Sequence, residues 1–361
     1  MHWHWLHPLV ARPGQGAAFL ALAVLVALAV DRLWGEPPAR WHPVVWMGQA
    51  LGACGRWVAP TASTGRDLKG FWLAALFWCA LAAIVLIVSA LLQAAVLYVW
   101  SAPTDVCGVI FDSPGLGLNR SSPRAGVMGC LLAGMLLGLL LKPLFAFRLL
   151  LREVRAVEDA LARSLGEGRA RLAWLVSRDV TQLSADEVRQ SAIESLAENL
   201  NDSVVAPLFW FAVAGLPGAA LYRLANTADA MWGYRGMREG RYWEWAGKWA
   251  AHADDVLSWL PARITALLLA LAGRGVRPRA LAREARRTPS PNSGWPMAAM
   301  ALVLDVRLTK PGVYQLHAQG RAPGAPDVAR AETVASKVVM AIAGIAGAAI
   351  VIVVIEGVWN V

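Results

Sequence analysis

The chain has 361 residues, of which 57% are hydrophobic and only 16% are charged. A soluble domain carries about 25% charged residues, so this composition excludes an ordinary soluble protein and indicates one that is embedded in lipid. The formal net charge of +9 fits the basic loops that membrane proteins keep in the cytoplasm, and no zinc-finger or RNA-binding signature is present. We expect an integral membrane protein with the lipid bilayer, and no nucleic acid, as its partner.

A helix needs about 20 apolar residues to cross a bilayer. Four segments meet or approach this length, and firm transmembrane helices are predicted at 17–30, 71–100, 126–141 and 338–355. Two further apolar segments, 204–224 and 256–272, contain proline, and the second also contains Arg263. An arginine at membrane depth normally faces a cavity or a partner. These two segments are predicted either to span the bilayer or to re-enter it.

Lysine and arginine are concentrated between the spans. The segment 31–70 holds five of them, 142–203 nine and 273–336 ten, whereas 101–125 holds two. The positive-inside rule places the basic segments in the cytoplasm. If both proline-containing segments re-enter, 225–255 also lies there, and we favour this arrangement because it gathers the polar motifs on one face.

The predicted fold class is therefore all-α. It is a polytopic integral membrane protein with about four firm transmembrane helices, two proline-broken segments and an amphipathic cytoplasmic helical region. Residues 1–361 are treated as one membrane-embedded domain, with a cytoplasmic helical loop at 142–203 and a basic cytoplasmic loop at 273–336. Within the first loop, 144–165 has apolar residues at helical spacing, so it is expected to lie on the membrane or to pack on other loops.

Acidic residues follow one another at four-residue spacing in IESLAENLNDSVVAPLFWF (193–211). Glu194, Glu198 and Asp202 would lie along one stripe of a helix, although like charges at this spacing destabilise it by roughly 0.2–0.5 kcal/mol per pair. No lysine or arginine occurs between Arg189 and Arg223. One interpretation is a solvated acidic face. The other, which we favour, is a site for a hard cation such as Mg²⁺, which binds carboxylates together with substrate phosphates.

The stretch YRLANTADAMWGYR (222–235) carries oxygen-bearing side chains between two arginines. Asn226, Thr227 and Asp229 lie between Arg223 and Arg235, an arrangement that suits a phosphate–metal assembly. Closely spaced Asn, Thr and Asp are also ordinary helix-capping residues, so both interpretations stay open.

Two later stretches place acids or a polar turn beside arginine. Asp254 and Asp255 precede the segment that contains Arg263, and they either cap a helix or form a carboxylate pair beside a membrane arginine. Arg287 is followed by the polar turn SPNSG (290–294), which suits phosphate contact through guanidinium and backbone N–H groups. Positive-inside charge followed by a turn is the alternative.

The loop DRLWGEPPARWHPVVWMG (31–48) is rigid because of its prolines. Together with the four stretches above, it closely resembles the motifs of the adenosylcobinamide-phosphate synthase family of cobalamin biosynthesis, the CbiB/CobD type. The resemblance extends from Asp31 to about Leu308. Glu36 stands where the family usually has aspartate, Ser258 stands where asparagine is typical, and the part after Leu308 matches loosely.

The resemblance implies a multi-pass enzyme of the cell (inner) membrane with its active face in the cytoplasm. The implied reaction is ATP-dependent amide ligation, in which (R)-1-amino-2-propanol or its O-phosphate joins the free propionate of adenosylcobyric acid to give adenosylcobinamide or its phosphate. ATP and Mg²⁺ are the implied cofactors, and other late cobalamin-pathway enzymes are candidate partners. Both forms of the amine stay open, as do an acyl phosphate and an acyl adenylate.

The matched motifs also imply residue roles. Catalytic roles are assigned to Glu198, Asp202, Arg223, Asp229, Arg235, Asp255 and Arg263. Substrate or phosphate binding is assigned to His42, Asn199, Asn226, Thr227, Arg287, Ser290 and Asn292. Metal binding is assigned to Glu194, Glu198 and Asp202.

Two non-enzymatic classes share some of these features. A membrane sensor of the AmpE type is distantly similar to the family, but a sensor has no need for the polar motifs ENLND, NTADAMWGYR and SPNSGWP. A small transporter with broken helices would place its polar groups at the bilayer midplane, whereas the acids here cluster at the edges of segments. Both comparisons favour the ligase.

Overall fold

The structure is a computed structural model that describes residues 13–62, 65–101, 123–273 and 275–359. It is helical apart from two short hairpins, and six helices in these ranges are long and apolar enough to cross a membrane. These findings confirm the predicted fold class. Most of the segment 101–125, which has few basic residues, lies outside the described residues.

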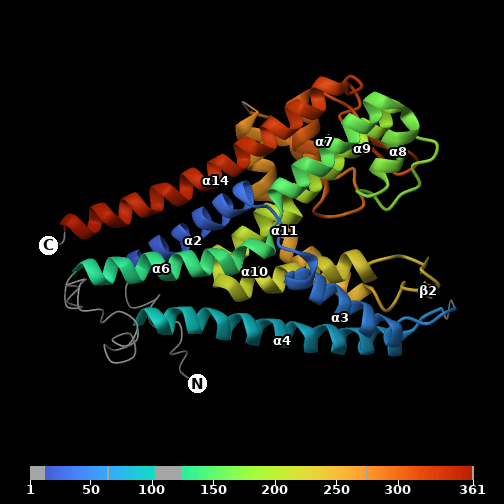
Figure 1. The fold of residues 1–361 in the computed structure, drawn as a ribbon. Helices are drawn as coiled ribbons and strands as arrows, with labels where there is room; N and C mark the ends of the chain where they lie inside the picture. The colour runs from blue at the N-terminus through green and yellow to red at the C-terminus, as the bar shows by residue number, and fades with distance from the viewer. Residues whose placement is uncertain (1–12, 63–64, 102–122, 274, 360–361) are drawn as a thin grey trace.

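Four long helices extend toward the same end of the molecule (Figure 1). They are α2 (Pro13–Leu33), α4 (Leu68–Ser101), α6 (Pro123–Leu141) and α14 (Ala325–Trp359), and they contain the four firm spans predicted from the sequence. α2 packs on α6 and α14. A glycine is needed where α6 meets α2, because a Cβ on Gly138 would lie 2.7 Å from the carbonyl oxygen of Ala23.

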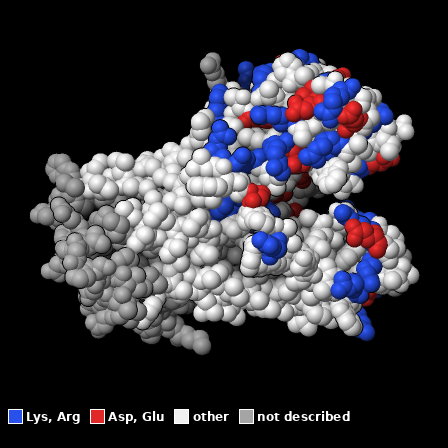
Figure 2. Space-filling model, viewed as in Figure 1, with Lys and Arg blue, Asp and Glu red and all other residues white. Residues whose placement is uncertain are grey.

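The opposite end carries most of the charged side chains that are visible in Figure 2. Its elements are the 3₁₀ turns Ala39–Trp41 and Lys142–Leu144, α3 (Pro43–Val58), α7 (Phe147–Arg163), α8 (Leu165–Leu172), α9 (Ala185–Leu200), α12 (Pro278–Ala285), α13 (Gly294–Leu304), the hairpin β1–β2 (Met237–Arg238 and Arg241–Tyr242) and the hairpin β3–β4 (Leu308–Lys310 and Tyr314–Leu316). The space-filling view shows a cleft between two lobes at this end (Figure 2), and the same view of the ribbon has α3 and β2 in one lobe and α7, α8 and α9 in the other (Figure 1). The polar segments thus gather at one end, as the sequence predicted.

α7 is the amphipathic helix expected within 144–165. Its apolar side, which includes the buried Val154 and Val157, packs on α8, α9 and α14. Of the two expected arrangements, the structure therefore shows packing on other helices.

α10 (Ala206–Trp232) reverses direction at Ala214 and Gly215. Gly215 has φ 65° and ψ −154°, a backbone conformation that is essentially restricted to glycine. The buried Gln93 of α4 accepts a hydrogen bond from the N–H of Leu216 at 2.7 Å. Gln93 lies 25 residues after the first residue of α4, so the tip of this hairpin is about 37 Å along that helix. The reversal agrees with re-entry of 204–224 and not with a single crossing.

α11 (Lys248–Ala272) lies across both limbs of this hairpin. The indole N–H of Trp210 donates to the carbonyl of Leu257 at 2.9 Å, and the hydroxyl of Tyr222 is 3.0 Å from that of Ser258. α11 runs unbroken through Pro261, so the prediction that proline breaks this segment is wrong. Pro261 has no N–H for the Leu257 carbonyl one turn earlier, and Trp210 supplies that hydrogen bond instead.

The hairpin tip yields a stability prediction. Gly215→Ala is expected to destabilise the protein by at least about 1–3 kcal/mol, because the residue would be strained and its Cβ would lie 2.3 Å from the Gln93 side-chain oxygen. Gly344→Ala is the matched control, since nothing lies within 4 Å of a Cβ there. Denaturation in detergent measures both variants, and equal stabilities would contradict the reversal.

Candidate active site

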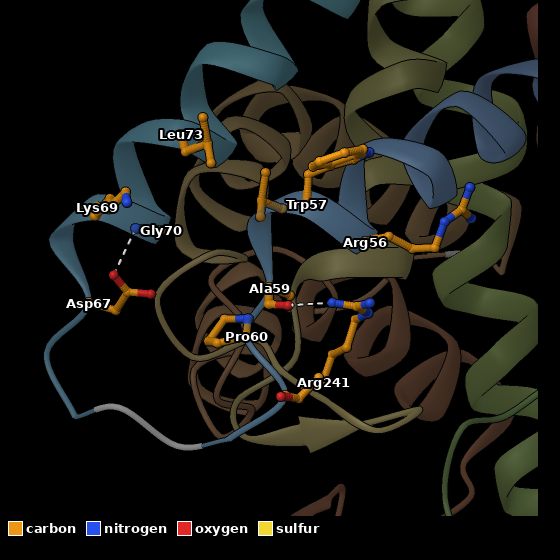
Figure 3. Close-up of a pocket in the computed structure, with 11 residues that line it drawn as sticks. Arg56, Trp57, Ala59, Pro60, Asp67, Lys69, Gly70, Leu73 and Arg241 are labelled. Atoms are coloured by element: carbon orange, nitrogen blue, oxygen red, sulfur yellow. Dashed lines mark hydrogen bonds between the residues drawn. The ribbon is translucent and has the colours of Figure 1, made fainter.

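A cavity of about 360 Å³ lies where α3, α4 and β2 meet (Figure 3). Arg241 donates to the carbonyl of Ala59 at 2.7 Å, and Asp67 accepts a hydrogen bond from the N–H of Gly70 at 2.8 Å. These contacts fasten β2 to the end of α3 and cap α4. None of the residues assigned a role from the sequence lines this cavity.

The acidic row begins on α9. Ser184 and Glu187 form a capping box at the start of this helix. Two turns later, the buried Glu194 accepts a hydrogen bond from Arg178 at 2.7 Å through one carboxylate oxygen, and the other oxygen has no partner among the described residues. Arg178 comes from the loop before α9, so a tertiary contact supplies the positive charge that the local sequence lacks. Burial and the nearby carboxylate of Glu194 raise the pKa of Tyr314, which keeps its hydroxyl protonated.

Glu198 follows one turn after Glu194 and is partly exposed. Its charge interacts with those of Asp202 and Glu194, and with those of Lys310 and Arg178. Even so, its carboxylate forms no hydrogen bond or ion pair within the described ranges. A carboxylate between other charges, with its oxygens uncommitted, is free to bind a ligand.

Asp202 lies in a π-helical turn (Asn201–Val205) that joins α9 to the hairpin. Such turns often occur at functional sites. The amide of Asn201 donates to the Asp202 carboxylate at 2.7 Å, and Arg223 donates to the Asp202 carbonyl at 3.1 Å. The Nε atom of Arg223 is buried and has no partner among the described residues. The arginine is therefore held beside the acidic row with one donor uncommitted.

A second group of acids adjoins the first. Asp254 of α11 lies 3.5 Å from the amide of Asn226, and its charge interacts with those of Asp202 and Asp229. Asp255 interacts with the charge of Arg235. The stretches around 202, 229 and 254, separate in the sequence, thus form one network. Asp254 was given no role from the sequence, although its motif was recognised.

The SPNSG turn is fixed onto α11. Asn292 accepts from Arg263 at 2.8 Å and donates to the carbonyl of Asp255 at 2.7 Å. Arg263 also lies over the rings of Trp259 and Trp295, at 4.5 and 5.0 Å from their centroids. Arg263 thus contacts other protein groups, as expected for an arginine at membrane depth. It joins the SPNSG turn to α11.

Several predicted binding residues have other contacts. The side chain of Arg287 pairs with Glu284 at 3.0 Å. Thr227 donates to the carbonyl of Arg223, and Asn199 donates to the carbonyl of Ser195, each within its own helix. Ser290 accepts from two backbone N–H groups of its own turn, at 3.2 Å each. These contacts stabilise local structure, and the structure does not bring Arg287 to the acidic network.

The loop 31–48 joins the site through a buried lysine. Lys142 lies 3.1 Å from Asp31 and 2.8 Å from Glu36, and His42 lies 3.1 Å from Glu36. Burial alone would raise the pKa of Glu36, but hydrogen bonds from His42 and Lys142 hold it below its usual value. The Glu36 charge in turn interacts with Arg223. The sequence did not indicate this role, because Lys142 is a single basic residue directly after an apolar helix.

Removing this lysine is expected to be costly. Lys142→Met leaves the buried Asp31 without its ion pair and leaves Glu36 with His42 alone, and it should destabilise the protein by about 3–5 kcal/mol. Lys69→Met, at an exposed lysine without an ion pair in the described ranges, is the control. Thermal unfolding in detergent distinguishes the two, and a Lys142→Met protein as stable as the control would contradict the assigned ion pairs.

Known proteins are similar to this chain over most of its length. The family model described as CobD/Cbib protein matches residues 24–343. The chain belongs to the CobD/CbiB family. A "Probable cobalamin biosynthesis protein CobD" of Methanothermobacter thermautotrophicus is 39% identical over 300 residues, covering 81% of this chain and 85% of that protein.

Other CobD/CbiB relatives are similar over a comparable length. A "Cobalamin biosynthesis protein CobD" of Halalkalibacterium halodurans is 36% identical, covering 81% of this chain and 82% of the relative. One of Chromobacterium violaceum is 38% identical, covering 80% and 81%. No solved structure matches. The chain thus belongs to a protein family of cobalamin biosynthesis.

Proposed function

We propose that this protein is an ATP-dependent amide ligase. It joins (R)-1-amino-2-propanol, or its O-phosphate, to the free propionate of adenosylcobyric acid and forms adenosylcobinamide or its phosphate. The observation that carries the proposal is the joining of the Glu198 and Asp202 carboxylates, Arg223 and the acids of α11 into one network. Family membership supports the same reaction class. The active face is proposed to be cytoplasmic, in the cell (inner) membrane.

The donor set fits a magnesium ion that is shared with a substrate. No three His, Cys, Asp or Glu side chains in the described ranges lie close enough together to hold a metal ion alone. Mg²⁺ commonly uses only one or two carboxylates and completes its shell with water and phosphate oxygens. Glu198 and Asp202 suit this role better than Glu194, whose carboxylate is held by Arg178. Bound there, Mg²⁺ would offset the negative charge of ATP phosphates.

The remaining groups suit the two organic substrates. Arg223 has an uncommitted donor beside Asp202 and would stabilise negative charge that develops as the propionate is activated. Asp229 and Asp254 are neighbouring acids whose mutual repulsion a bound cation would relieve, so they suit the ammonium group of aminopropanol. A carboxylate there would also accept the proton that the amine loses before it attacks the activated carbonyl.

Purified protein in detergent provides the direct test. With ATP, Mg²⁺, adenosylcobyric acid and aminopropanol phosphate, wild type should form the amide product. Glu198→Gln and Asp202→Asn should each lower kcat by about 10²- to 10³-fold, because each removes charge next to the reacting phosphates. Asp186→Asn, an exposed acid at the start of the same helix, should be unaffected. Unchanged rates in the first two variants would contradict the assignment, and absence of product with wild type would contradict the reaction.

A further inference from the structure

The β3–β4 hairpin packs directly on α9, the helix that carries the acids. Leu308 pairs with Leu316, and both side chains are fully buried in the core. Lys310 pairs with Tyr314 at the other end of the hairpin. Since side chains alternate along a strand, Lys310 lies on the same face as Leu308 and therefore turns toward α9.

The contacts of Tyr314 fix where this face lies. Its hydroxyl donates to the sulfur of Met297 at 3.8 Å and lies near enough to Glu194 for the two groups to interact electrostatically. Paired side chains on one face of a hairpin have Cβ atoms about 4.5–5.5 Å apart. Lys310 therefore lies next to the acidic row, where its charge interacts with both Glu194 and Glu198.

Lys310 and Glu198 are opposite charges that do not pair. Arg178 is already held by Glu194 at 2.7 Å. By contrast, neither Lys310 nor Glu198 forms an ion pair in the part of the chain that the structure describes. Their charges interact, but the two side chains form no hydrogen bond or ion pair with each other. A ligand that carries a cation toward Glu198 and an anion toward Lys310 would satisfy both.

We propose that Lys310 binds a phosphate group of the nucleotide, next to the acidic row of α9. This inference rests on the proposed function, because it takes the nucleotide from that reaction. A divalent cation beside Glu198 and a phosphate beside Lys310 keep the local charge balanced. Lysine serves as a compact point charge for phosphate, as it does in other nucleotide sites. The hairpin thus provides a phosphate contact from a part of the chain where the family motifs match only loosely.

Equilibrium binding tests the inference without requiring turnover. Purified protein is titrated with a non-hydrolysable ATP analogue in the presence of Mg²⁺. Lys310→Met and Lys310→Gln should weaken binding about 10- to 100-fold, the value of one hydrogen bond to a charged group. Lys310→Arg should retain most of the affinity. In the full reaction, the KM for ATP should rise in the Met and Gln variants while the KM for the amine stays unchanged.

The matched control is Thr309→Ala, which changes the opposite face of the same strand and removes only a 3.5 Å contact with Gln315. It should bind the analogue like wild type, and thermal unfolding should show that all variants are folded. Unchanged binding in both Lys310→Met and Lys310→Gln would overturn the inference, as would a wild type that binds no nucleotide. Nucleotide binding that depends on Lys310, without amide product, would support the inference and contradict only the proposed function.

Discussion

The structure depends on one electrostatic constraint: carboxylates at the edge of an apolar helical assembly must be compensated. Buried charges are stable only when they are paired or bound to a ligand. Glu194 satisfies this requirement within the protein, through Arg178. Glu198 and Asp202 have positive charges nearby, on Lys310 and Arg223, but no ion pair with either. A ligand is therefore expected at Glu198 and Asp202, the acids of the network that have no ion pair.

The helical hairpin brings this network together. Because α10 reverses at Gly215, the limb that carries Arg223 returns beside the limb that begins at Asp202. α11 lies across both limbs, and the tryptophan that crosses to it satisfies the carbonyl that Pro261 leaves free. The family motifs are far apart in the sequence, and this arrangement brings three of them together, because Arg223 contacts Asp202 and Asn226 contacts Asp254.

Much of this architecture could be predicted from the sequence. The four long apolar helices, the amphipathic α7 and the acidic helix α9 follow from hydrophobic periodicity and capping residues, which are local properties. The continuity of α11 through Pro261 could not be predicted, since it depends on a hydrogen bond from Trp210, 51 residues before Pro261. The partner of Glu194 and the role of Lys142 could not be predicted either, because ion pairs between distant segments leave no periodic pattern. The same limit explains Arg287: a basic residue before a polar turn suits phosphate, but here a nearby glutamate binds it.

The central claim is that the carboxylates of Glu198 and Asp202 take the divalent ion that carries the nucleotide. Electron paramagnetic resonance with Mn²⁺ in place of Mg²⁺ tests this most directly, because it reports both the bound ion and its coupling to phosphorus. The account predicts, in the presence of the ATP analogue, bound Mn²⁺ with ³¹P coupling in wild type and its loss when Glu198→Gln and Asp202→Asn are combined. The same bound, phosphorus-coupled Mn²⁺ in the double variant would contradict it.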